Sequence, residues 1–373
     1  MTLSSEGSPV EEFILRIPLW RWSLLIFALT LIVHFSFYRL TGVDRTFEFN
    51  EMEKIARSLA EGNVFGNPYA LPTGPTAHHA PIYPFLLSLV FRMFGYGPDA
   101  RLIQAFINIT FVAAQMALLP YLSRIAQLPL SVGVVAGLVA ALVPSRVLKE
   151  TRFESCISGL AAVLFVMLVL RWLRKEHPST RESIMAGFLA GICILATPPL
   201  LLVMLALVAS WFLRRLRRQV IILAVACCAA LLPWTIRNFV ELGGFVPLRS
   251  NYPLELSVSN EDDSHAESVA NFGNPIFRHP STNTAEAIRV QQLGELQYNR
   301  ERAREARTWI VSHPRRFLSL TARRLFTSGS RPIPSVRCTN ACSTTQSRSW
   351  DSLGCIACSS GACRLLMSSA QSS

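Results

Sequence analysis

The sequence has few charged side chains for its length. Of its 373 residues, 16% are Asp, Glu, Lys or Arg and 51% are hydrophobic, with a mean hydropathy of +0.34. Soluble domains carry about 25% charged residues, so this composition excludes an ordinary soluble globular protein. The long apolar runs that take the place of the missing charge predict an integral membrane protein.

Acidic residues are scarce relative to basic ones. There are 24 Asp and Glu against 36 Lys and Arg, which gives a net charge of +12. In a soluble protein this excess would suggest a nucleic-acid partner. Here the basic residues cluster at the ends of apolar runs, as in RRLRR at 214–218, where they act as topology signals. We therefore expect no nucleic-acid partner.

A cleavable signal peptide is not expected either. The first apolar run, at 19–38, is long enough to span a bilayer, and no small-residue cleavage site follows it. Six further runs bring the predicted number of spans to about seven, although several are shorter than the roughly 20 residues of a straight span. Pro198 and Pro199 are predicted to form the turn between the fifth and sixth runs. The seven runs lie near 19–38, 102–122, 130–144, 157–173, 184–198, 199–213 and 219–236.

The positions of Lys and Arg predict the orientation of these spans. Basic residues follow the second run at Arg124, the fourth at 171–181 and the sixth at 214–218. An N-terminus inside the cell places all three groups in the cytoplasm. Residues 39–101 and everything after about Arg237 then lie outside.

The stretch NEMEKIARSLAEG at 50–62 follows the first run directly. Its apolar residues recur at helical spacing and form one stripe: Met52, Ile55, Ala56 and Leu59. Glu51 borders this stripe, and Glu48 shares its face if the helix begins at or before Glu48. These acids would then face the space between the helix and the membrane bundle. The alternative is that they merely suit the helix dipole.

Two adjacent histidines, His78 and His79, lie in the next stretch, PTGPTAHHAPIYP. They could bind a metal ion or a phosphate, and an incidental polar loop is the alternative. Residues 81–94 are apolar but too short to cross a bilayer. They are predicted to form an interfacial helix on the outer surface.

Charged residues also lie beside two later runs. KETRFES contains Glu150 and Glu154 with Arg152 between them, next to the membrane core, where charge is costly unless it is paired or functional. An ion pair within the loop is the alternative. After the last run, Arg237 and Arg249 are suited to an anionic partner such as a phosphate.

Three regions follow from this pattern. Residues 1–236 form a transmembrane region that includes the first outside loop at 39–101, and residues 237–327 form an outside polar segment with a long helix near 285–313. The tail at 328–373 is rich in Ser and looks like out-of-frame translation or a truncated end. Its cysteines approach a zinc-site spacing without the expected strand signals, and disulfides are the alternative. They are Cys338, Cys342, Cys355, Cys358 and Cys363.

Taken in order, these stretches resemble the polytopic glycosyltransferases of the GT-C superfamily, in particular family 39, the protein mannosyltransferases, and the bacterial lipid A aminoarabinose transferases. The resemblance covers about residues 15–327. Its motifs are IARSLAEG, PTGPTA, the PIYP helix that ends in FRMFG, LPWTIRN, and the block from HPSTNTAEAIRV to SHPRRFLSLTARR.

The resemblance implies an all-α polytopic fold, namely a GT-C-like helical bundle with an interfacial first-loop helix and an outside polar segment. It implies a multi-pass protein of the bacterial cytoplasmic membrane. The reaction would transfer a sugar from a polyprenyl-phosphate donor to a lipid, protein or glycan acceptor on the outer face. No cofactor is fixed by the resemblance, and a divalent cation is a candidate.

The family's site residues can be carried over by position. The first-loop acid, which would act as general base or orient the acceptor hydroxyl, is Glu51 or Glu48, and the second-loop acid is Glu154. No residue is assigned as a metal ligand. A phosphate leaving group departs as an anion, so the site needs a base near the acceptor and cations near the phosphate. The substrate-binding candidates are Arg237, Arg249, Asn260, Glu261, His78, His79 and Tyr83.

Two other functions remain open. A transporter or flippase for a lipid-linked sugar would show internal repeats and midplane charges, whereas this chain shows no repeat and places its charges in outside loops. An inactive remnant is the second alternative. Members of the family that the chain resembles have further spans after the position of the two arginines that end SHPRRFLSLTARR.

Overall fold

The computed structural model describes residues 9–41, 50–144, 154–266 and 277–327, and every regular element in these ranges is a helix. This confirms the predicted all-α class. The tail at 328–373 lies outside the described residues. The helices are α1 Pro9–Leu15, α2 Leu19–Thr41, α3 Glu51–Ala60, α4 Ile82–Phe94, α5 Pro98–Ala117, α6 Leu119–Ala126, α7 Leu130–Leu142, α9 Ser155–Leu173, α10 Thr180–Ala196, α11 Leu201–Leu213, α12 Arg217–Leu242, α13 Tyr252–Val258, α15 Thr284–Leu293, α16 Glu295–Ser312 and α17 Pro314–Thr327.

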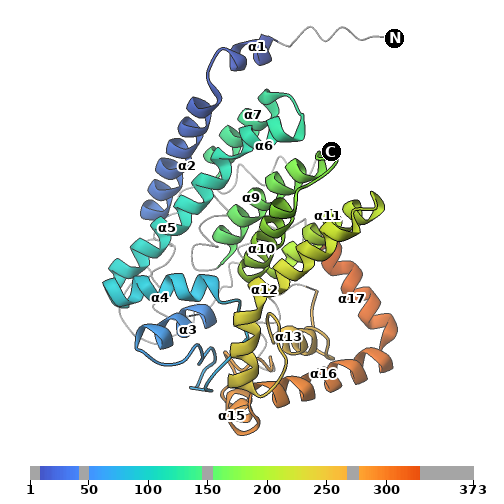
Figure 1. Ribbon diagram of the computed structural model, residues 1–373. Helices are drawn as coiled ribbons and strands as arrows, with labels where there is room; N and C mark the ends of the chain where they lie inside the picture. Colours follow the sequence, from blue (N-terminus) through green and yellow to red (C-terminus); the bar gives the residue numbers. More distant parts are fainter. Residues whose placement is uncertain (1–8, 42–49, 145–153, 267–276, 328–373) are drawn as a thin grey trace, which may run out of the picture. The chain divides into compact units, whose positions relative to one another are not determined.

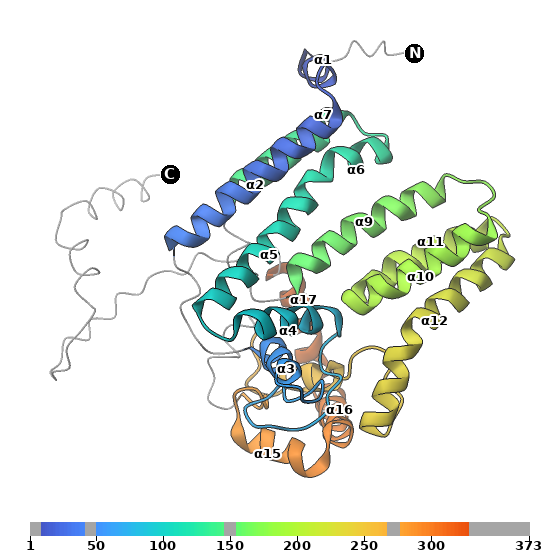
Figure 2. The same cartoon turned by 60° about the vertical axis from the view of Figure 1, so that its left-hand side comes forward.

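The apolar runs form a group of neighbouring helices (Figures 1 and 2). Four helical segments are long and apolar enough to cross a membrane, namely α2, α5 with α6, α9 and α12. All seven predicted runs are helical, since α7, α10 and α11 account for the other three. The protein therefore has the character of a membrane protein. That all seven helices cross a bilayer stays a prediction.

Two helix boundaries depend on proline and glycine. α10 ends at Ala196, and a 3-10 turn at Pro198–Leu200 separates it from α11, as the proline pair predicts. The stretch predicted to be helical near 285–313 is helical except at Gly294, which divides it into α15 and α16. Gly294 has φ +76°, which glycine adopts without steric cost and which interrupts a helix.

Small residues bring α10 close to α12. Gly187 and Gly191, one turn apart on α10, lie directly against the backbone of α12 at Leu223 and Cys227. A Cβ added at Gly191 would lie 2.6 Å from Cβ of Ala230 and 2.9 Å from the carbonyl oxygen of Cys227. Such close backbone approach at glycine is typical of helix pairs in membranes.

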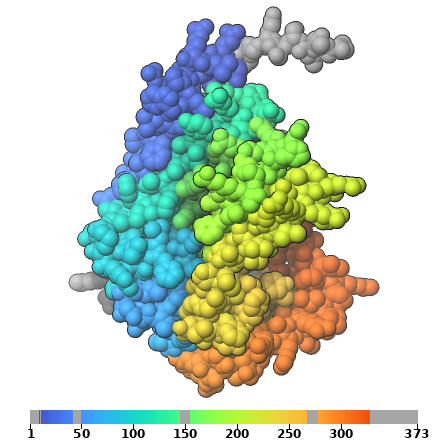
Figure 3. Space-filling model, viewed as in Figure 1, coloured from blue at the N-terminus to red at the C-terminus, as the bar shows by residue number. Residues whose placement is uncertain are grey.

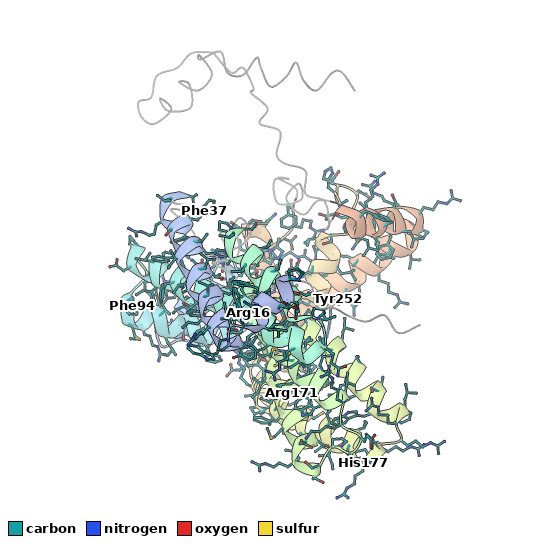
Figure 4. All side chains as sticks on the ribbon, turned by 90° about the horizontal axis from the view of Figure 1, so that it is seen from above. Arg16, Phe37, Phe94, Arg171, His177 and Tyr252 are labelled. Carbon is teal, nitrogen blue, oxygen red and sulfur yellow. The ribbon has the colours of Figure 1, made fainter. Side chains whose placement is uncertain are left out.

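Helix α4 has two different sides. Tyr83, Leu87 and Phe91 are buried against α3. Its 13 residues reach only about 20 Å, short of the roughly 30 Å hydrocarbon core of a bilayer. This pattern fits the predicted interfacial helix, whose position in a membrane stays a prediction. The other side exposes apolar side chains, including Phe94 at the edge of the structure in Figure 4: Phe85, Leu89, Met93 and Phe94.

The polar elements gather at one end of the apolar helices. In Figure 3 the first-loop residues, the end of α12 and the orange residues of α15 and α16 meet there. A shared core joins them, because Tyr69 of the first loop packs with Leu254 of α13, Val290 of α15 and Tyr298 of α16. Segments from both polar regions of the sequence thus form one structural unit.

We expect Gly191→Leu to destabilise the chain by about 1–3 kcal/mol, because the added side chain has no space between α10 and α12. The measurement is thermal unfolding in detergent, followed by tryptophan fluorescence. Gly97→Ala is the matched control, since nothing lies within 4 Å of a Cβ at that position. Equal melting temperatures for the two variants would contradict the close packing of α10 and α12.

Candidate functional site

Helix α3 begins at Glu51 because a capping box fixes its start. The Oδ1 atom of Asn50 accepts a hydrogen bond from the Glu53 amide at 3.0 Å, and the Asn50 amide donates to the Glu53 carboxylate at 2.9 Å. The sequence shows this signal as Asn-x-x-Glu. Glu48 lies outside the described residues, so its predicted place on the same face stays untested.

The acid that faces the apolar helices is Glu53 rather than Glu51. Its side chain is fully buried and forms an ion pair with Arg101 of α5. Gln104 also donates to Glu53 at 3.2 Å and to the Tyr83 hydroxyl at 3.1 Å, and Asn108 donates to the same hydroxyl at 2.9 Å. Tyr83, predicted to bind substrate, therefore belongs to this buried network.

Glu51 lies instead among histidines. Its Oε2 atom is 3.0 Å from Nε2 of His78 and 3.0 Å from Nε2 of His79. Its Oε1 atom is 3.4 Å from Nδ1 of His279, whose Nε2 lies 3.8 Å from Glu255. We call these five residues the histidine cluster. The expectation that Glu51 faces the space between α3 and the bundle stays a prediction.

The loop that carries the two histidines is held by the start of α16. The carboxylate of Glu295, the first residue of α16, accepts hydrogen bonds from the hydroxyl of Thr76, from the Ala77 amide at 2.9 Å and from the hydroxyl of Ser250. Glu295 was not among the predicted site residues, although it lies in the last block of the resemblance, directly after Gly294.

Arg249 connects the histidine cluster to the membrane helices. Its guanidinium donates to Nδ1 of His79 at 2.8 Å, to the carbonyl oxygen of His78 at 3.2 Å and to Glu154 at 3.0 Å. Glu154 precedes α9 directly. The structure therefore brings together Glu51, Glu154, Arg249 and both predicted histidines. Glu150 and Arg152 lie outside the described residues.

Burial and neighbouring charges shift the pKa values of these groups in opposite directions. Burial lowers the pKa of His79 to about 4, so this ring is neutral at physiological pH. Burial also acts on His78, but the Glu51 carboxylate outweighs it and raises the His78 pKa. Burial would raise the pKa of Glu51, yet the histidines hold it well below its usual range. At Glu154 burial exceeds the opposing effect of Arg249, so the pKa is raised.

The donor atoms suit a divalent cation. Ligand atoms of Glu51, His78 and His79 lie within 4.8 Å of one another, and so do those of His78, Glu255 and His279. Imidazole nitrogen with carboxylate oxygen is the donor set of zinc and related metals. The Tyr69 hydroxyl, 3.1 Å from Nδ1 of His78, can accept the Nδ1 proton and leave Nε2 to bind a metal.

His79 is a poorer ligand in this geometry. Arg249 donates to its Nδ1 atom, so the neutral ring carries its proton on Nε2, which points at Glu51. Metal binding at this Nε2 requires Arg249 to give up that hydrogen bond. His279 of the second ligand group has the same restriction, because its Nδ1 atom accepts from the Ser281 amide at 3.2 Å. His78 belongs to both groups, and we therefore regard it as the central metal ligand.

A cavity of about 970 Å³ opens beside the histidine cluster. Glu51 and His79 line it, together with the polar face of α3 and the loop that follows α3. Its volume lies near the top of the range of about 300–1,000 Å³ for small-molecule sites.

The other predicted substrate-binding residues lie outside the histidine cluster. Arg237 donates to the carbonyl oxygens of Thr76 at 2.6 Å and Phe65 at 2.7 Å, and so supports the histidine loop from behind. Asn260 donates to a carbonyl oxygen of its own helix turn and accepts from Arg324. Glu261 is half-buried among charges of the later polar segment, and burial raises its pKa.

Comparison with known proteins adds no relative. No family model matches this chain. No curated protein and no solved structure matches it either.

We expect Arg101→Ala to destabilise the chain by about 3–5 kcal/mol, because the substitution leaves Glu53 buried without its cation. Thermal unfolding in detergent measures the change. Arg57→Ala is the control, since the Arg57–Glu61 ion pair is exposed and is worth about 0–1 kcal/mol. A melting temperature for Arg101→Ala close to that of Arg57→Ala would contradict a structural role for the buried pair.

We expect the purified chain to bind Zn²⁺, and His78→Ala to remove most of that binding. Protons compete for His78, whose pKa is raised, so metal affinity falls as pH falls through that pKa. Metal content after dialysis against Zn²⁺ buffers, at a series of pH values, measures both effects. His313→Ala removes an exposed histidine outside the histidine cluster and serves as control. Equal metal content in both variants would rule out the histidine cluster as the metal site.

Proposed function

We propose that this chain is a membrane glycosyltransferase that moves a sugar from a polyprenyl-phosphate donor to an acceptor on the outer face of the bacterial cytoplasmic membrane. The observation that carries the proposal is the position of the histidine cluster. It lies at one end of the apolar helices, between Glu154 before α9 and an open cavity. A lipid-linked donor and a water-borne acceptor could both reach such a position.

The acid and base groups of the site support this assignment. In the transfer, an acceptor hydroxyl oxygen forms a bond to the anomeric carbon while the bond from that carbon to the phosphate oxygen breaks. The phosphate leaves with the bonding electrons, and the hydroxyl proton passes to a carboxylate. Glu154 suits this last role, because its pKa is raised and its buried Oε2 atom has no hydrogen-bond partner among the residues that the structure describes.

Glu51 has the complementary role. Its lowered pKa makes it a weak base, and its contacts with histidines make it an anchor for positive charge. A divalent ion held there would stabilise the charge on the departing phosphate. The family resemblance allowed the first-loop acid to be the general base. The contacts of this chain favour Glu154 as the general base and Glu51 as the residue that would hold the divalent cation.

We expect Glu154→Gln and Glu51→Gln to lower transfer by at least about 10²-fold each, because one removes the proton acceptor and the other the anchoring charge. Transfer to acceptors in native membranes, from a radiolabelled polyprenyl-phosphate sugar, is the measurement. Glu48→Gln and the double variant with Glu51→Gln test whether the first-loop acids act together.

The control for this assay is Glu301→Gln, which removes a partly exposed carboxylate that pairs with Arg289 on the polar segment. It should transfer at the rate of the unaltered chain. Retained activity in both Glu154→Gln and Glu51→Gln would refute the proposed chemistry. Movement of the labelled lipid across the bilayer without transfer would instead favour a flippase.

A further inference from the structure

The cavity beside the histidine cluster follows the polar face of α3. Its lining runs from Glu51 through Lys54 and Ser58 to Glu61. Ten residues of helix correspond to about 15 Å, so the cavity is elongated. At one end it reaches Glu51 and His79, where the proposed transfer takes place.

The wall of the cavity is fixed by hydrogen bonds. Ser58 donates to the carbonyl oxygen of Val64 at 2.8 Å and accepts from Asn67 at 3.3 Å. Lys54 donates to the carbonyl oxygen of Tyr69 at 3.1 Å. Side-chain amides, hydroxyls and a lysine are thus held in place along one wall, as in a site that is formed before its ligand arrives.

The position of the cavity separates it from the membrane helices. The opposite face of α3 packs Ala56 on α4, and Ile55 packs on Trp234 of α12. The apolar surface of α4 that is suited to lipid lies beyond that packing, at Phe85 and Leu89. The cavity therefore lies on the opposite face of α3 from the lipid-suited surface of α4.

The lining favours a ligand rich in hydroxyl groups. It combines hydrogen-bond donors and acceptors with short apolar patches at Leu71 and Pro72. The C–H faces of sugar rings can pack against these patches. Among the described residues, the cavity has no β-strand edge to which an extended peptide could add as a further strand. Its length and volume exceed what one sugar ring requires.

We propose that this cavity binds a carbohydrate acceptor of more than one sugar unit, whose reacting hydroxyl extends past Glu51 and His79 toward Glu154. The inference rests on the proposed function for the identity of the ligand as acceptor. Arg249 contacts both His79 and Glu154, so a single guanidinium separates the end of the cavity from the proposed base.

The test uses the full chain in detergent on an array of bacterial surface glycans, with Ser/Thr-rich peptides on a matched array. Ala70→Trp places a large side chain in the cavity, because Ala70 is exposed and lines it. Val311→Trp is the matched control, since Val311 is 72% exposed and does not line the cavity. Both variants are checked for unchanged thermal unfolding and unchanged Zn²⁺ content.

We expect glycan binding by the unaltered chain, binding at least about tenfold weaker in Ala70→Trp, and a change within about twofold in Val311→Trp. In the transfer assay Ala70→Trp should raise the acceptor KM more than it lowers kcat. Peptide binding alone, no glycan binding, or equal effects of the two tryptophans would each overturn the inference. If no polyprenyl-phosphate sugar is used but Ala70→Trp still abolishes glycan binding, the proposed function fails and the carbohydrate site stands.

Discussion

The buried ion pair between Glu53 and Arg101 determines how the rest of the site is arranged. A fully buried carboxylate is costly unless it is paired and hydrogen-bonded, and Glu53 pairs with Arg101 and accepts from Gln104, both on α5. This fixes the rotation of α3 about its own axis. With Glu53 turned to the apolar helices, Glu51 must point to the histidines, and Lys54 and Ser58 must line the cavity.

A second layer of polar contacts holds the histidine loop without taking part in the histidine cluster. Glu295 binds the loop at Thr76 and Ala77, and Arg237 binds the carbonyl oxygen of Thr76 from another side. Each buried charge is thus used to position backbone rather than to meet a ligand. The consequence is a rigid base for His78 and His79, which a metal or transfer site requires.

Two arginines show how far sequence reasoning reaches. Arg237 and Arg249 lie in the same stretch and were equal candidates for an anionic partner. In the structure Arg249 joins the histidine cluster through His79 and Glu154, whereas Arg237 is used by the backbone of the first loop. Apart from the contact of Arg237 with the adjacent Asn238, their hydrogen-bond partners lie between 95 and 172 residues away along the chain, so the local sequence does not distinguish them.

The sequence by itself determined the all-α class, the seven apolar helices, the amphipathic helix after the first of them and the short apolar helix α4. Each of these follows from hydrophobic periodicity and run length, which act between neighbouring residues. It also marked Glu51, Glu154, His78, His79 and Arg249. Only the tertiary structure decided that these five converge, that His279, Glu255 and Glu295 join them, and that Glu53 is the acid turned toward the membrane helices. Such contacts depend on how distant segments pack, and no local pattern records that packing.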